Sequence, residues 1–170
     1  MSNSIAQTRR EWILSLRSGD YPQTTGRLQD PEGYCCLGVL AEMTIEPAWQ
    51  PCENNDPSDD LYYLIPAADG LNPWIEMPPP EVLDSVGISE GVAEEFADFN
   101  DSGYNFQQMA AVLEDFFNWA VDEGMEPDET LSYEDFKEWE ASKNPEFWEE
   151  IVAINPTATN LKPRILALVN

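Results

Sequence analysis

The sequence predicts an α+β fold, a mostly helical single domain over residues 1–170 with a small antiparallel sheet or hairpin. Helices are indicated because apolar residues recur at helical spacing, often directly after a residue that can cap a helix. Strands are indicated only near the N-terminal half, where turns rich in glycine and proline separate short extended segments. With 170 residues, of which 42% are hydrophobic, the chain can bury a substantial core.

The N-terminal part of the sequence is predicted to form a helix, a hairpin and a second helix. One apolar stripe favours a helix over residues 4–17, and Gly19 follows as a natural C-terminal stop. Residues 23–28 and 32–34 are expected to be extended and to form a hairpin around the intervening turn. The dense apolar set in residues 36–43 then favours a buried helix.

The middle of the sequence is predicted to add one strand and three helices. The short apolar and aromatic run at residues 61–65 favours a strand, and a run of prolines introduces a short helix over residues 81–86. Ser89 is expected to cap a helix that runs to about Phe99. Asn105, with a glutamine three residues later, resembles a capping box for another helix. These last two helices are expected to pack as a pair.

The C-terminal third repeats this pattern of caps followed by apolar residues. Ser132 can cap one helix, and Asn144 with Pro145 supplies the cap and first-turn proline of the next. A further apolar segment occupies residues 160–170.

Composition excludes several classes of protein. The sequence contains no histidine, so the common Ser-His and Cys-His nucleophile pairs and most zinc sites are excluded. No apolar run is long enough for a membrane span or a secretory signal, and an odd number of cysteines does not suit a disulfide framework. We therefore expect a cytoplasmic protein that is not an enzyme and uses no cofactor, metal or membrane.

Two cysteines at the predicted start of a helix are the remaining candidates for a nucleophile. Cys35 or Cys36 would have a lowered pKa if the helix N-terminus stabilised its thiolate. The alternative is that both are small buried apolar residues, which is the usual environment of a free cysteine.

One short motif resembles the first half of a calcium-binding loop. Asp98, Asn100 and Ser102 have the required spacing, but the position that needs a bidentate glutamate is Met109. We interpret the motif as a turn that connects two helices.

Negative charge dominates the sequence, with a formal net charge of −25 from 33 acidic and 8 basic residues. No lysine or arginine occurs between Arg27 and Lys137, while acidic residues recur throughout that span. Such a surface repels nucleic acid and attracts basic partners over about a Debye length, ~8 Å at physiological salt. The expected partner-binding residues are Asp56, Asp59, Asp60, Glu94, Glu95, Asp98, Asp101, Glu114, Asp115, Asp122 and Glu123.

The few basic residues cluster toward the ends of the sequence and suggest a ligand site as an alternative. If the termini meet, a cationic pocket is expected from Arg9, Arg10, Arg17, Arg27, Lys162 and Arg164, with backbone amides of Gly26, Gly33 and Gly38 facing an anion. The arginines would otherwise form local surface ion pairs with Glu11, Asp20 and Asp30. The alternative ligand-binding set is Arg17, Arg27, Gly33, Tyr34, Cys35, Cys36 and Gly38.

The cysteine-containing segment carries a resemblance to a family. The block Gly33-Tyr34-Cys35-Cys36-Leu37-Gly38-Val39-Leu40 resembles a family of small uncharacterised phage and prophage proteins. The segments at residues 16–19, 23–28 and 99–110 are similar to the same family. The resemblance implies a phage setting, in which small proteins without catalytic groups act on host defence by binding.

Three hypotheses follow for the function. The first is a non-catalytic phage-type inhibitor that binds a host nucleic-acid-binding protein through an acidic surface imitating the phosphates of DNA. The second is a protein that binds or sequesters a small ligand, such as a nucleotide signal, through residues 17–38. The third is a structural protein whose acidity serves only solubility.

Overall fold

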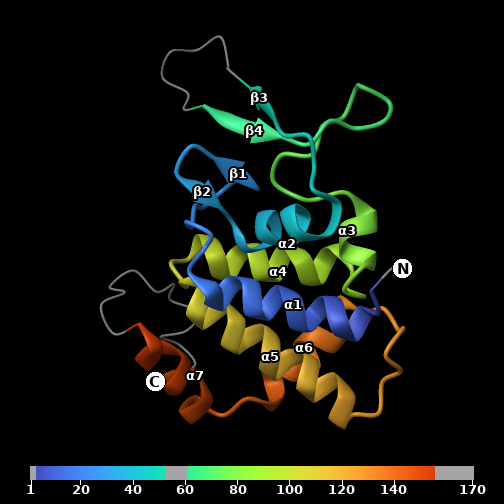
Figure 1. Ribbon diagram of the computed structural model, residues 1–170. Coiled ribbons are helices and arrows are strands. Elements are labelled where there is room, and N and C mark those ends of the chain that lie inside the picture. The colour runs from blue at the N-terminus through green and yellow to red at the C-terminus, as the bar shows by residue number, and fades with distance from the viewer. Residues whose placement is uncertain (1–2, 53–60, 156–170) are drawn as a thin grey trace.

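The computed structural model describes residues 3–52 and 61–155, in which a small sheet lies above a group of helices (Figure 1). The predicted mostly helical α+β fold is confirmed. The helices are α1 (Ile5–Ser18), α2 (Cys36–Ile45), α3 (Pro80–Asp84), α4 (Glu90–Asp101), α5 (Phe106–Asp122), α6 (Tyr133–Ser142) and α7 (Pro145–Ile154); the strands are β1 (Gln29–Asp30), β2 (Gly33–Tyr34), β3 (Gln50–Cys52) and β4 (Tyr62–Leu64).

Side chains cap the starts of most described helices, and four of these caps were predicted: Ser89, Asn105, Ser132 and Asn144. The Ser4 side chain caps α1, and Gly19 ends that helix with a φ of 80°, a left-handed conformation that glycine adopts without strain. The side chains of Ser89 and Asn144 accept hydrogen bonds from the backbone amide of the third residue of α4 and α7, respectively. Asn105 begins α5 with a reciprocal capping box. Local hydrogen bonds therefore set the helix starts.

Four helices form a closed ring around the core. Helix α1 packs on α2, α2 on α4, α4 on α5, and α5 on α1. Across this ring, Trp12 of α1 meets Phe96 of α4 edge-on, with 6.2 Å between ring centroids. Phe96 also meets Phe116 of α5 at 5.7 Å. All three rings are fully buried, and each such side chain removes about 150–250 Å² from water, so they anchor the ring of helices.

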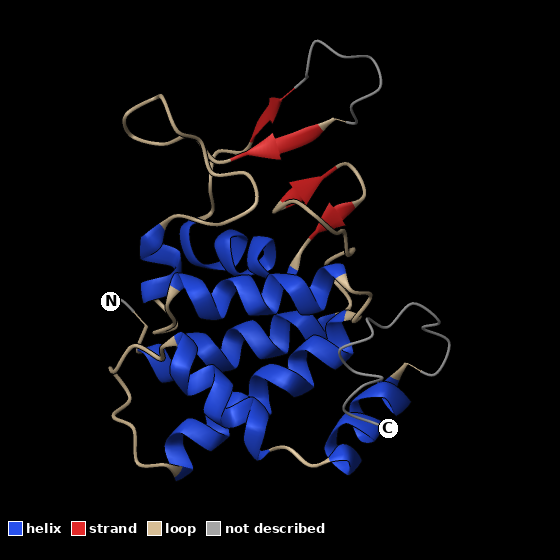
Figure 2. Cartoon of the chain, turned by 180° about the vertical axis from the view of Figure 1, so that it is seen from behind, coloured by secondary structure: helices blue, strands red, loops and turns tan. Residues whose placement is uncertain are grey.

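Helices α6 and α7 cover the outer side of α4 and α5. Phe136 and Trp139 of α6 and Trp148 of α7 are buried there, and Trp148 stacks on Phe99 of α4 at 5.9 Å. Figure 2 shows the helices gathered below the strands. The apolar segment at residues 160–170 lies outside the described residues. Among the helices of the described chain, none is long and apolar enough to cross a membrane.

The antiparallel sheet has the strand order β2-β1-β4-β3. The strand predicted at residues 61–65 is confirmed as β4, and the predicted hairpin exists as β1 and β2. The prediction that residues 23–28 form its first strand is wrong. Leu28 instead turns into the core, where it is fully buried and its amide donates to the Ile75 carbonyl oxygen at 2.8 Å. Because this contact joins segments far apart in the sequence, the first strand of the hairpin lies closer to the turn than predicted, at residues 29–30.

Candidate functional site

A groove of about 440 Å³ lies between α4 and the segments at residues 26–27 and 76–77. Six carboxyl groups and one guanidinium group line it, with Cys35, Met77 and Ala97 among them. We name it the acidic groove; its charged residues are Glu76, Glu90, Glu94, Glu95, Asp98, Asp101 and Arg27.

The helical spacing of α4 places its acidic side chains along the groove. Glu90, Glu94 and Asp98 follow one another at four-residue intervals, about 6 Å of helix rise, and all three are exposed. Phe96 and Phe99 point to the other side and are buried in the core. Because this apolar side is anchored, the spacing of the carboxyl groups is set by a rigid helix.

Hydrogen bonds at the end of α4 fix the opposite wall. Asn100 is fully buried; its side-chain oxygen accepts from the Cys36 amide at 3.2 Å, and its nitrogen donates to the Thr24 carbonyl oxygen at 2.9 Å. The Asp101 carboxylate accepts a hydrogen bond from the Gly26 amide at 2.8 Å. These contacts tie the loop before β1 to α4 and thereby set the width of the acidic groove.

Arg27 contributes the guanidinium group of the acidic groove. Its guanidinium carbon lies 4.0 Å from the centroid of the Tyr62 ring, a cation–π contact that orients the side chain on β4. One guanidinium group stands against six carboxyl groups. The acidic groove therefore keeps an excess of negative charge that can meet cations of a partner.

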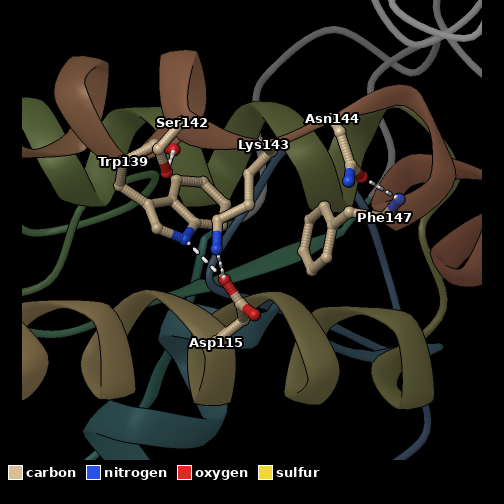
Figure 3. Close-up of polar contacts among 6 residues, drawn as sticks. All are labelled: Asp115, Trp139, Ser142, Lys143, Asn144 and Phe147. Carbon is tan, nitrogen blue, oxygen red and sulfur yellow. Dashed lines mark hydrogen bonds and ion pairs between the residues drawn. The ribbon is translucent and has the colours of Figure 1, made fainter.

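The acidic side chains of α5 are engaged within the fold. Glu114 accepts a hydrogen bond from Arg17 at 2.7 Å, and this bond lowers the pKa of Glu114. Asp115 accepts from the indole nitrogen of Trp139 at 2.8 Å and forms an ion pair with Lys143. Figure 3 shows both side chains pointing to the same carboxylate. Two predicted partner-binding residues are thus compensated inside the molecule.

The other predicted partner-binding residues divide into three groups. Four lie on α4 and line the acidic groove: Glu94, Glu95, Asp98 and Asp101. Two are exposed at the C-terminal end of α5, away from the residues of the acidic groove: Asp122 and Glu123. Three lie outside the described residues: Asp56, Asp59 and Asp60. The structure therefore brings part of the predicted acidic surface together.

The two adjacent cysteines are buried, as one of the two interpretations expected. Cys35 caps α2 and is 3% exposed, while Cys36 is fully buried. Burial raises the pKa of Cys35 to about 12 and raises the pKa of Cys36 as well. The expectation of a lowered pKa is wrong. Removing a thiolate from water destabilises it more than the helix N-terminus stabilises it, so the pKa rises.

The predicted cationic pocket forms only in part. Arg27 lies in the acidic groove instead. Three of its expected members lie together between α1 and α5: Arg9, Arg10 and Arg17. Two more lie outside the described residues: Lys162 and Arg164. The alternative of local ion pairs does not hold within the described residues, because Arg17 pairs with the distant Glu114 rather than with Glu11, Asp20 or Asp30.

The alternative ligand-binding residues are divided between different parts of the fold. Arg17 lines the groove between α1 and α5, whereas Arg27 and Cys35 line the acidic groove. Two glycines of the set allow close packing. A Cβ atom at Gly33 would overlap the Pro22 carbonyl oxygen, and one at Gly38 would overlap the Leu28 carbonyl oxygen. The remaining members are the buried Cys36 and the half-buried Tyr34, whose ring meets Tyr21 and Trp49.

The motif that resembles a calcium loop ends α4, as the interpretation of a helix-connecting turn expected. The Asn100 side-chain oxygen accepts from the Cys36 amide, and the Ser102 hydroxyl donates to the Asp98 carbonyl oxygen. Across residues 3–52 and 61–155, no three acidic or cysteine side chains are arranged to hold a metal ion.

Sequence reasoning missed Glu76 and Glu90 as members of the acidic groove. Glu90 was detectable, because it precedes Glu94 and Asp98 at the same four-residue interval. Glu76 carries no comparable signal. It reaches the groove only because Ile75 pairs with Leu28, a contact between segments far apart in sequence.

Comparison with known proteins gives one match. The model of a domain family of unknown function, DUF8296, matches residues 4–117, which span α1 to α4 and most of α5. No curated protein and no solved structure matches the chain. The matched residues include every charged residue of the acidic groove.

Proposed function

Since the chain belongs to the DUF8296 domain family, whose model covers the whole acidic groove, we propose that this groove carries its function. The protein binds the basic surface of a nucleic-acid-binding protein through the acidic groove and inhibits that protein. The proposed action is non-catalytic. The candidate nucleophiles Cys35 and Cys36 support this view, because they are buried and have raised pKa values.

The observation that carries the proposal is the row of carboxyl groups on α4. Glu90, Glu94 and Asp98 repeat about every 6 Å along a helix whose other side is fixed in the core. A DNA duplex shows one negative charge per ~1.7 Å of its axis, so a rigid row of carboxylates competes for the same lysine and arginine side chains. Order and rigidity distinguish such a row from acidity that serves only solubility.

The chemistry of the groove favours a protein partner over nucleic acid. Its carboxyl groups repel phosphates, and they are spread along a groove rather than gathered around a single cation. The side chains of Cys35, Met77 and Ala97 supply apolar contact surface among the charges. These features suit the alkyl stems and charged ends of lysine and arginine.

We also propose a phage or prophage origin for the protein. The support is the block Gly33-Tyr34-Cys35-Cys36-Leu37-Gly38-Val39-Leu40, which resembles small proteins of that origin. The partner would then be a host defence protein with a basic nucleic-acid channel, such as a restriction or CRISPR component, in the cytoplasm of the host.

The test is displacement of a fluorescent DNA duplex from purified restriction and CRISPR proteins. We expect the protein to displace the duplex from at least one of them, and less effectively as salt is raised. The double variant Glu90→Gln and Glu94→Gln should weaken inhibition about five- to thirtyfold, since two interfacial ion pairs contribute roughly 0.5–1 kcal/mol each.

A matched control separates the acidic groove from total charge. The double variant Asp122→Asn and Glu123→Gln removes the same charge from exposed positions outside the groove. It should inhibit within about twofold of the unmodified protein, in line with weak exposed charges. Equal loss in both double variants, or inhibition that does not respond to salt, would show that the acidic groove is not the docking surface.

A further inference from the structure

A second groove, of about 420 Å³, lies between α1 and α5. We name it the arginine groove, after three guanidinium groups that line it together with one carboxyl group, Glu114. Helices α1 and α4 occupy opposite corners of the four-helix ring, so the arginine groove and the acidic groove lie on different sides of the molecule.

Apolar side chains also line the arginine groove. Leu14 is 57% exposed and Val121 is 66% exposed, one from each of the two helices. Phe117 lines the same groove and is 6% exposed. A single exposed leucine or valine is ordinary on a protein surface. Here the two flank one concave site whose size is within the range of about 300–1,000 Å³ that holds small ligands.

The three arginines of the groove differ in what they contact. Arg9 is buried and donates to the Val86 carbonyl oxygen at 2.8 Å, and its guanidinium carbon lies 4.6 Å from the Phe117 ring centroid. Desolvation lowers its pKa to about 10, so Arg9 remains a cation at neutral pH. Arg17 is paired with Glu114. Arg9 and Arg17 therefore already have partners within the fold.

Arg10 differs because its guanidinium group has no protein partner. It is exposed, and within the described residues it takes part in no hydrogen bond, ion pair or ring contact. The other described cations all have a partner, which is expected in a chain with a formal net charge of −25. An uncompensated guanidinium beside apolar side chains matches an anion that carries an apolar body.

We propose that the arginine groove binds a small amphipathic carboxylate. The carboxylate lies on the free guanidinium group of Arg10, and the apolar part lies along Leu14, Phe117 and Val121. A second copy of the chain is a poorer occupant, because two bodies with a formal charge of −25 repel each other. A metal or an organic cation is excluded by the arginines.

The test is an NMR titration with three probes that share a tail: decanoate, decanol and decyltrimethylammonium, each at a concentration at which it is dissolved as single molecules. We expect decanoate to shift amide signals of residues 6–17 and 114–121. Arg10→Gln should weaken decanoate binding about tenfold, the effect of one lost charged hydrogen bond. Arg10→Lys keeps the charge but lacks the planar guanidinium group, so it should weaken decanoate binding less than Arg10→Gln does.

Matched controls make the test independent of the proposed function. Arg27→Gln removes the same charge from the acidic groove and should leave decanoate affinity within about twofold, as a distant site should. The double variant Glu90→Gln and Glu94→Gln should bind decanoate normally. Equal responses to the three head groups, signal changes across the whole spectrum, or full affinity in Arg10→Gln would overturn the proposal. Binding of an acidic peptide in place of decanoate would overturn it too.

Discussion

Helices α4 and α5 both carry acidic residues on their outer sides, yet they use them differently. On α5, Glu114 is paired with Arg17, and Asp115 is held by Lys143 and Trp139. On α4, Glu90 and Glu94 form no ion pair with any described residue and line the acidic groove. The count of acidic residues in the sequence is therefore a poor guide to the charge that a partner meets.

The difference arises from what packs beside each helix. Helices α1, α6 and α7 surround α5, and four of the described cations lie near it: Arg9, Arg10, Arg17 and Lys143. The outer side of α4 faces the loops before β1 and α3, which contribute Arg27 and the further carboxyl group of Glu76. Glu114 and Asp115 of α5 thus contribute to the fold, whereas Glu90 and Glu94 of α4 form no ion pair with any described residue.

The largest expected effect is at the residue that joins α4 to the opposite wall of the acidic groove. Asn100→Ala removes the acceptor of the buried Cys36 amide and the donor to the Thr24 carbonyl oxygen. A buried group left without a partner costs about 1–3 kcal/mol, so we expect the free energy of unfolding to fall by roughly 3 kcal/mol. Urea denaturation measures this loss. Asn118→Ala, at an exposed position of α5, is the control and should cost less than about 1 kcal/mol.

The next effect tests the contrast between the two helices directly. Asp115→Ala removes the carboxylate that Lys143 and Trp139 share, and should destabilise the protein by about 1–3 kcal/mol, as for hydrogen bonds to charged groups. Glu94→Ala should cost less than about 0.5 kcal/mol, because it removes an exposed side chain. Thermal unfolding of both variants measures the difference. Equal losses would contradict the division between structural and recognition carboxylates.

The smallest effect concerns the buried thiol on the floor of the acidic groove. Burial raises the pKa of Cys35 to about 12, so the folded protein keeps this proton where the unfolded chain loses it. Since the unfolded state then binds fewer protons, stability should fall with rising pH above about 9, by roughly 1.4 kcal/mol per pH unit for one thiol. Urea denaturation at increasing pH measures the slope.

Two variants isolate the contribution of that thiol to the slope. Cys35→Ala should have a shallower loss of stability above pH 9 than the unmodified protein, by about one proton. Val39→Ala removes buried apolar volume without a thiol and should keep the original slope at lower stability. An unchanged slope in Cys35→Ala would mean that its thiol ionises equally in the folded and unfolded states.

The parts of the fold that could be predicted are those determined by residues close together in the sequence. Ser89, Asn105, Ser132 and Asn144 each cap the helix that the sequence assigned to them, because a cap depends on residues within one turn. The first strand of the hairpin was misplaced for the opposite reason. The sequence around Leu28 does not reveal that its amide will pair with Ile75.

The same distinction between local patterns and tertiary contacts applies to the candidate site. The row of carboxyl groups on α4 could be predicted, since four-residue spacing on a helix is a local pattern. The second wall could not, because Arg27 and Glu76 meet α4 through tertiary contacts. Nor could the pairing of Arg17 with Glu114 be predicted, since these residues are 97 positions apart in the sequence.

Gly38, near the start of α2, packs against the segment that carries Arg27 of the acidic groove. It lies against the backbone of Leu28, the neighbour of Arg27, and any larger side chain would overlap that carbonyl oxygen. Only the hydrogen atom of glycine fits between α2 and the backbone of Leu28, and every other natural side chain is larger. A substitution at Gly38 therefore cannot change the width of the acidic groove in small steps. The charged side chains that line the acidic groove are not restricted in this way.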